Sequence, residues 1–404
     1  MLKRTLAGAA AALAIIASSA GAQEITGDVV KVGVLTDMSS LYADINGPGS
    51  VVAAEMAIED WGSSVLGKPI ELVSADTQNK PDIGLSVGGK WIDAEGVDVI
   101  IGGSSSAVTL AVQQMVGEKN RVLLVSDAAA STITGKACNA NTVHWTYDTA
   151  ALANGTGSAV VKAGGDSWFF LTADYAFGYA LESDVSSVVK ASGGKVLGNV
   201  RHPLNTTDFS SFVLQAQASG AKIVGLANAG GDTVNSIKAA SEFGLVQGGQ
   251  KLAGLLVFIT DVDSLGLQTA QGLNLTEAFY WDQNDETRKW SRRFFERFGK
   301  MPTSTQAGYY ASLTHYLKAV EALGTDAPGD KVVAKMKEIK TDDPLFGQGY
   351  IRPDGRKMHN MYLYEVKSPG ESKEKWDYYK FVREIPAEEA FRPMNEGGCP
   401  LVKQ

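Results

Sequence analysis

The sequence predicts an α/β protein of two doubly wound lobes, each with a parallel sheet covered by helices. Apolar segments of strand length alternate with stretches of helical periodicity along most of the chain, a pattern typical of such sheets. The strands are apolar throughout, which indicates that both of their faces are buried. Removing a predicted leader of 22 residues from the 404-residue chain leaves 382 residues. Since single cores tend to divide beyond about 250 to 300 residues, two lobes are expected rather than one sheet with an irregular loop.

The first 22 residues have the pattern of a cleaved export signal. Lys3 and Arg4 form a positive segment, and residues 6–16 are apolar. Small residues at 20–22 form a cleavage signal, so we expect the mature chain to begin after Ala22. The apolar run is shorter than the roughly 20 residues that a membrane-spanning helix needs. No cysteine follows it that could carry a lipid, and a freely soluble periplasmic protein is therefore expected.

The elements of the first lobe follow in order from short apolar runs and amphipathic stretches. The expected strands are 29–35, 70–75, 97–101 and 122–126, and the expected helices are 49–61 and 83–94. A polar stretch rich in Thr and Asn then replaces the next helix at 131–148. We interpret this stretch as the first crossing between the lobes.

The second lobe is expected to repeat the alternation. Its expected strands are 168–172, 195–200, 223–227 and 252–259, with amphipathic helices between them. A second crossing is expected after Tyr280 and Trp281, because the next helix, 287–298, is charged with aromatic residues on one face.

A third crossing is expected at the turn 352–356, which follows a helix at 305–323 and precedes hairpin strands at 358–366 and 376–382. The lobe boundaries follow from these three crossings. Lobe 1 is expected to contain 23–147 and 283–355, and lobe 2 to contain 148–282 and 356–385.

Cys138 and Cys399 are the only cysteines. An even count in an exported chain favours one disulfide, with two free thiols as the alternative. The disulfide would tie the C-terminal tail, 386–404, to the body of the protein.

The composition argues against several classes of partner and chemistry. Loss of Lys3 and Arg4 takes the formal net charge from −8 to −10, so nucleic acid is not expected to bind. The four histidines lack the spacing of a metal site, and the segment 47–49 lacks the third glycine of a dinucleotide fingerprint. No metal or cofactor is expected, and the protein is expected to be a monomer.

Ligands of doubly wound sheets bind beyond the carboxyl ends of the strands. In the first lobe the loops there are small, hydroxylated or aromatic, and they include Tyr42, 102–106 and 126–131. Serine hydroxyls and the free N–H groups of a helix N-terminus favour an anion such as a carboxylate. Ser106, which precedes a predicted helix at 107–116, fits this role best, and the alternative for such a serine is an ordinary N-cap.

The second lobe places Tyr175 and Phe177 after one strand and the loop from Asn228 to Asp232 after another. The two aromatic residues either cover an apolar ligand body or pack between the lobes. Asp232 begins a helix, so a favourable contact with the helix dipole is its alternative role.

Taken together, these loops resemble those of a known family. The segments 101–106, 125–131 and 173–178 resemble the type I periplasmic binding proteins, in particular the leucine/isoleucine/valine-binding branch of ABC-importer receptors. The resemblance runs over nearly all of the mature chain, and the order and spacing of its motifs are specific. It implies two lobes joined by three crossings that close around a small ligand, and a membrane permease as partner.

The resemblance also implies roles for individual residues. Ser106 and the segment matching Ala128 to Ser131, which includes Ala129, would hold the ligand carboxylate. An aromatic residue at or near Phe177 and a residue of the 228–232 loop would cover it from the other lobe. Tyr42 lies in the first-loop stretch from which the family draws an aromatic contact.

One region departs from the family pattern. Amino-acid-binding members carry a second-lobe acid for the ligand ammonium directly after the strand that matches 252–259. This chain has Leu255 to Phe258 there, and the nearest acids are Asp261 and Asp263. A gap in the alignment would restore Asp261 as the ammonium partner. Without such a gap, the expected ligand is an aromatic or branched organic acid that lacks an ammonium group.

Two other functions remain open from the sequence. The same two-lobed fold also serves receptors that report to a sensor kinase or a regulator. An exported hydrolase is disfavoured because the G-x-S-x-G nucleophile motif is absent. The expectation is therefore a binding protein without enzymatic activity.

Overall fold

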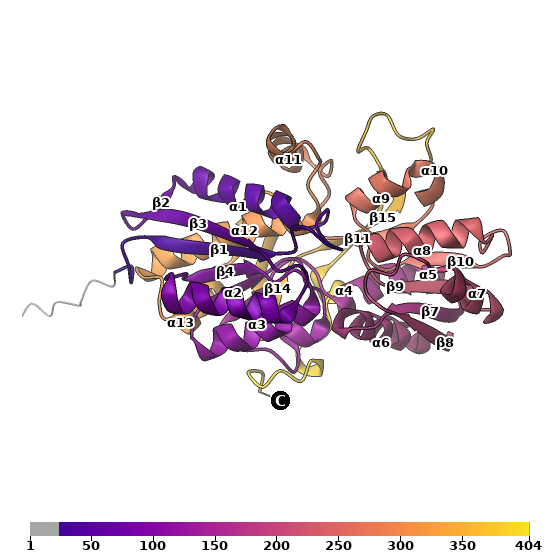
Figure 1. The fold of residues 1–404 in the computed structure, drawn as a ribbon, viewed down its shortest axis with the longest axis horizontal. Helices are drawn as coiled ribbons and strands as arrows, with labels where there is room; N and C mark the ends of the chain where they lie inside the picture. Colours follow the sequence, from indigo (N-terminus) through magenta and orange to yellow (C-terminus); the bar gives the residue numbers. More distant parts are fainter. Residues whose placement is uncertain (1–23, 404) are drawn as a thin grey trace, which may run out of the picture.

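The computed structural model describes residues 24–403, and Figure 1 shows them as two α/β lobes that lie side by side. The predicted leader and its cleavage site after Ala22 lie outside the described residues. No helix within 24–403 is long and apolar enough to cross a membrane.

The first lobe contains a six-stranded sheet in the order β2-β3-β1-β4-β5-β6. Its pairs are parallel except for β2 with β3. The strands are β1 (Val30–Thr36), β2 (Ser64–Val65), β3 (Lys68–Asp76), β4 (Val99–Gly102), β5 (Val122–Val125) and β6 (Thr142–His144). The helices are α1 (Gly47–Trp61), α2 (Pro81–Ala94), α3 (Ser106–Glu118), α11 (Asp285–Phe298), α12 (Ser304–Leu323) and α13 (Gly329–Glu338).

Both faces of this sheet are covered by helices. Val99 and Ile101 of β4 belong to the apolar cluster that contains residues of α1 and α12. Ile100, between them, belongs to a separate cluster with residues of α2 and α3. In Figure 1, α1 lies on one side of the sheet and α2 and α3 on the other. This two-sided burial explains why the strand is apolar at every position.

The second lobe contains a four-stranded parallel sheet in the order β10-β9-β7-β8. Its strands are β7 (Ser167–Ala173), β8 (Lys195–His202), β9 (Ile223–Ala227) and β10 (Lys251–Gly254). The helices are α4 (Thr149–Leu152), α5 (Ser158–Lys162), α6 (Ala176–Ala191), α7 (Ser210–Ala218), α8 (Gly231–Glu242), α9 (Ile259–Leu265) and α10 (Leu267–Ala270), with a π-helical turn η2 (Ala153–Gly157) after α4. The predicted fold class, two parallel-sheet α/β lobes, is confirmed.

Two predicted strands were wrong in extent. The strand expected at 252–259 ends at Gly254, and residues 255–258 form a loop before α9. Their side chains are apolar because they are buried without strand pairing, at 1% to 6% exposure. The strand expected at 358–366 is divided into β14 (Lys357–Met358) and β15 (Met361–Val366), which pair with different partners.

Two small antiparallel sheets accompany the crossings between the lobes. One contains β11 (Asn274–Glu277), β15 and β16 (Tyr379–Ile385), and the other contains β12 (Thr341–Asp343), β13 (Gly347–Ile351) and β14. The predicted hairpin is therefore present as β15 and β16, although its second strand spans Tyr379–Ile385 rather than 376–382. The chain moves from one group of elements to the other after β6, after β11 and after β14, and the exact lobe boundaries stay a prediction.

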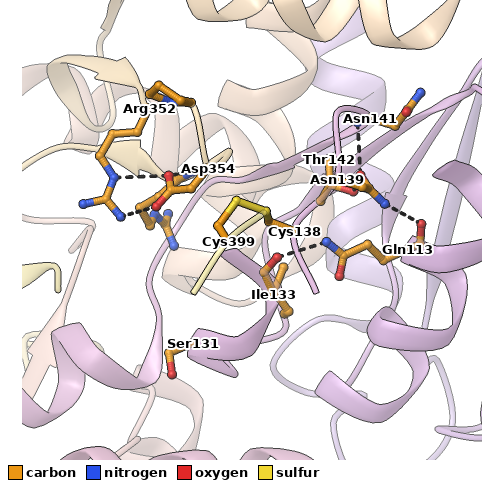
Figure 2. Close-up of a disulfide and its surroundings, with 12 residues drawn as sticks. Gln113, Ser131, Ile133, Cys138, Asn139, Asn141, Thr142, Arg352, Asp354 and Cys399 are labelled. Atoms are coloured by element: carbon orange, nitrogen blue, oxygen red, sulfur yellow. Dashed lines mark hydrogen bonds and ion pairs between the residues drawn. A yellow bond between two sulfur atoms is a disulfide. The ribbon is translucent and has the colours of Figure 1, made fainter. Parts of the chain in front are cut away.

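The predicted disulfide is present between Cys138 and Cys399 (Figure 2). It links the first lobe to the C-terminal tail, which contains the short helix α14 (Ala387–Ala390) and the turn η3 (Met394–Glu396). Arg392 of the tail donates a hydrogen bond to the carbonyl of Ser131, with a distance of 2.9 Å. The tail is thus held covalently beside a loop that the sequence places at the ligand site.

Candidate ligand-binding site

A small cavity of about 20 Å³ lies between the lobes. It is formed by loops that follow β1, β4, β5 and β6 of the first lobe and β7, β9 and β10 of the second, as expected for doubly wound sheets. In this conformation the cavity has room for little more than a water molecule, so its position and its lining, rather than its volume, mark it as a ligand site. The lining residues are Tyr42, Ile45, Asn46, Ser104, Ser105, Ser106, Asp127, Ala128, Ala129, Tyr147, Tyr175, Phe177, Ala229, Leu256 and Phe258.

The loop after β4 brings backbone close to the cavity. Gly102 and Gly103 have φ values of 102° and 135°, which favour glycine. A Cβ atom on Gly102 would lie 2.1 Å from the hydroxyl of Tyr309, so this position has no room for a side chain. Ser104 also has a positive φ, of 66°, and its N–H donates to Oδ2 of Asp127 over 2.9 Å. The positive φ values and this hydrogen bond allow the chain to turn sharply from β4 into the first residues of α3.

Ser106 is the first residue of α3, and the N-cap position belongs to Ser105, whose side chain makes no capping hydrogen bond. The Ser106 hydroxyl oxygen accepts hydrogen bonds from the N–H groups of Ala129, at 3.3 Å, and Ala130, at 3.1 Å. Because a serine hydroxyl has two acceptor positions and one proton, its proton is left to donate to another group. Ser106 is therefore a donor at the positive end of a helix, which suits a carboxylate.

Aromatic side chains enclose the remainder of the cavity. Tyr42 and Tyr147 come from the first lobe, and Tyr175, Phe177 and Phe258 come from the second. The hydroxyl oxygens of Tyr42 and Tyr175 lie 2.6 Å apart in a hydrogen bond that joins the lobes. The lobes are thus in contact over the cavity, and its walls suit a flat or branched apolar group.

Six of the ten predicted contact residues line this cavity, and four do not. Those in the lining are Tyr42, Ser106, Ala128, Ala129, Tyr175 and Phe177. Ser131 lies just beyond the lining loop, where its N–H donates to the Thr149 hydroxyl. Asn228 is fully buried and accepts a hydrogen bond from the Thr233 hydroxyl.

Asp232 and Asp261 line a separate cavity of about 490 Å³ between the lobes. One Asp261 carboxylate oxygen accepts the N–H of Phe258, at 2.9 Å, where α9 begins. Burial disfavours the charged form and raises the pKa of each carboxyl group to about 7. Asp261, the expected partner of a ligand ammonium if the alignment contains a gap, therefore does not line the smaller cavity.

Asp127 is the one carboxylate in the lining of the smaller cavity, and sequence reasoning did not select it. It follows β5 after Ser126, in a loop that otherwise contains small residues. An acid among alanines immediately after a buried strand was the available signal. Burial raises the pKa of Asp127 to about 6, although the Tyr309 hydroxyl opposes this by donating a hydrogen bond.

Among residues 24–403, no group of three or more His, Cys, Asp or Glu side chains is arranged to hold a metal ion.

Comparison with known proteins places this geometry in context. The sequence matches the Periplasmic binding protein family over residues 29–373. The chain is similar to a crystal structure of a periplasmic binding protein from Burkholderia mallei, with 56% identity and a TM-score of 0.91, covering 93% of this chain and 100% of that one. It is also similar to a branched chain amino acid ABC transporter periplasmic ligand-binding protein from Burkholderia xenovorans, with 42% identity and a TM-score of 0.82, covering 92% and 99%.

A more distant structure was determined with a ligand. It is a solute binding protein of an ABC transporter from Rhodopseudomonas palustris in complex with p-hydroxybenzoic acid. Identity is 26% and the TM-score is 0.80, covering 89% of this chain and 97% of that one.

Proposed function

Because the chain belongs to the periplasmic binding protein family and is a solute-binding protein of an ABC transporter rather than an enzyme, we propose that its ligand is a small carboxylate with an aromatic or branched body. The observation that carries this proposal is that the two sides of the cavity differ: one side offers hydrogen-bond donors and the other is mainly apolar. Ser106 and the N-terminus of α3 supply donors on one side. The second lobe supplies only Tyr175, Phe177, Ala229, Leu256 and Phe258, with no acid.

The similar proteins support both forms of the ligand body. The name of the Burkholderia xenovorans protein refers to branched chain amino acids, and the Rhodopseudomonas palustris protein holds a hydroxylated benzoic acid. Both ligands carry a carboxylate. The receptor would close its lobes around such a ligand, because the ligand binds the closed state more tightly than the open state. The closed receptor would then deliver the ligand to the permease of an importer.

The test is a thermal-shift series on the mature protein with paired ligands. Each of benzoate, 3-phenylpropanoate, 4-methylpentanoate and their hydroxy and amino derivatives is compared with the corresponding primary amide. A carboxylate at about 100 times its dissociation constant should stabilise the protein by roughly 2.7 kcal/mol, while its amide should not. Equal shifts with an acid and its amide, or no shift with any acid, would contradict the proposal.

Ser106→Ala should weaken binding of the best carboxylate by roughly 1.5 to 3 kcal/mol, because a hydrogen bond to a charged group is lost. Calorimetry measures the affinity directly. Ser131→Ala is the matched control, because Ser131 lies in the neighbouring segment without lining the cavity, and it should leave the affinity unchanged. An unchanged affinity for Ser106→Ala would remove Ser106 from the site.

A further inference from the structure

Asp127 lines the ligand cavity and has one side-chain oxygen that makes no hydrogen bond within the described residues. The residue is 7% exposed, and its Oδ2 atom accepts hydrogen bonds from the Ser104 N–H, at 2.9 Å, and the Tyr309 hydroxyl, at 2.7 Å. Its Oδ1 atom is buried and has no hydrogen-bond partner within residues 24–403. A buried acceptor without a donor is costly, most of all when it is charged. This oxygen is therefore suited to a donor that arrives with the ligand.

The position of Asp127 fixes where on the ligand that donor must be. Its carboxyl group is bonded to Ser104, two residues before Ser106 in the chain. On its other side, Ala129 and Ala130 donate to the Ser106 hydroxyl. Asp127 thus lies between the two segments that form the carboxylate end of the cavity, and the second lobe contributes no acid there. A ligand group that reaches Asp127 is close to the ligand carboxylate.

The charge of Asp127 strengthens this requirement. Burial raises its pKa to about 6, so the carboxyl group is mainly ionised at pH 7.5. The backbone N–H groups of Asp127 and Ala128 lower the pKa from nearby, yet neither completes a hydrogen bond to Oδ1. A ligand carboxylate beside Ser106 would be repelled by this second negative charge. A hydrogen-bond donor placed between the two charges would remove that repulsion.

We propose that Asp127 determines specificity by accepting a hydrogen bond from a hydroxyl or ammonium group close to the ligand carboxylate. Plain acids with the same carbon skeleton then bind more weakly. The inference rests on the proposed function, because it assumes that a carboxylate occupies the Ser106 side of the cavity. The acid that pairs with the ligand's donor group would then come from the first lobe, because the second lobe contributes no acid to this cavity.

The first measurement uses the unmodified protein at pH 7.5 and needs no variant. Dissociation constants are compared within three sets: 4-methylpentanoate, 2-hydroxy-4-methylpentanoate and leucine; 3-phenylpropanoate, 3-phenyllactate and phenylalanine; benzoate, 2-hydroxybenzoate and 4-hydroxybenzoate. In any set that binds, the member with the donor near the carboxylate should bind on the order of 10-fold to 100-fold more tightly. The first two sets show whether hydroxyl or ammonium is preferred. In the third set, 4-hydroxybenzoate places its donor too far away and should resemble benzoate.

Asp127→Asn then separates a role in specificity from a role in folding. It should weaken binding of the donor-bearing acid by about 10-fold or more and strengthen binding of the plain acid, because the repulsion is gone. A purely structural role would weaken both acids alike. Asp261→Asn is the matched control, since Asp261 is a buried acid outside this cavity, and it should leave the ratio unchanged.

The possible failures are distinguishable. If no carboxylate binds the unmodified protein, the proposed function and this inference both fail. If carboxylates bind but the plain acid is as tight as its donor-bearing partner, or Asp127→Asn changes both equally, the inference alone is overturned.

Discussion

A Cys399→Ser variant is expected to lose up to about 5 kcal/mol of unfolding free energy relative to the oxidised protein, because the disulfide closes a very long loop. Cys138 and Cys399 are separated by 261 residues. In the chain-entropy account, the disulfide restricts the unfolded chain more strongly as that separation grows. Urea denaturation without reductant measures the difference, and the midpoint should shift to lower urea.

Three hydrogen bonds hold the tail close to the disulfide or to the elements that lead into the second lobe. Arg392 donates to the Ser131 carbonyl, and Arg352 donates to the Arg392 carbonyl at 2.8 Å. Asn154 donates to the carbonyl of Ala390 at 2.9 Å. These three hydrogen bonds are each worth about 1 kcal/mol in net terms, so their combined contribution is smaller than the largest loss expected for the disulfide.

The control for this prediction is the second cysteine. Cys138→Ser and the double Cys138→Ser/Cys399→Ser variant should be destabilised as much as Cys399→Ser, because all three lack the same bond. Thiol titration of denatured, unreduced protein should find no free thiol. Additive losses in the double variant, or two titratable thiols in the unmodified protein, would contradict the disulfide.

The sequence predicted the fold well where burial and secondary structure agree. Strands such as β5 are apolar because helices cover both faces of the sheet, and such runs are easy to recognise. The prediction failed at 255–258, because those side chains are buried as a loop and produce the same apolar pattern as a strand. Periodicity records burial, and it does not record which backbone conformation achieves it.

The candidate site was predictable in position but not in detail. The convergence of loops at the carboxyl ends of strands brought Tyr42, Ser106 and Tyr175 to one cavity. The direction of a side chain depends on local hydrogen bonds that sequence spacing does not report. Asp261 thus folds back to the start of its own helix, while Asp127 reaches the cavity lining from a loop of alanines.

The second large effect is expected from a buried ion pair in the turn before β14. Arg352 and Asp354 form two hydrogen bonds, Nε to Oδ1 at 3.2 Å and Nη2 to Oδ2 at 2.6 Å (Figure 2). Their side chains are 8% and 1% exposed. Asp354 also accepts the N–H of Arg356, at 3.1 Å. The Asp354 carboxylate therefore neutralises the buried charge of the Arg352 guanidinium, and it also holds the backbone of the turn.

Asp354→Ala should lower the free energy of unfolding by about 3 to 5 kcal/mol, because it leaves the charge of Arg352 buried without its partner. Replacing both residues by leucine should restore much of the loss, since apolar pairs often substitute for buried ion pairs without net cost. Urea denaturation of Arg352→Leu, Asp354→Leu and the Arg352→Leu/Asp354→Leu double variant forms a cycle that isolates the pair. Losses that simply add would show that the two residues act independently.

The chain offers a control with nearly the same geometry at the surface. Arg383 and Glu389 also form two hydrogen bonds, at 3.2 Å and 2.7 Å, but their side chains are 36% and 44% exposed. Water solvates each charge when its partner is removed, so Glu389→Ala should cost only about 0 to 1 kcal/mol. If Asp354→Ala cost no more than Glu389→Ala, burial would not be the cause of the predicted effect.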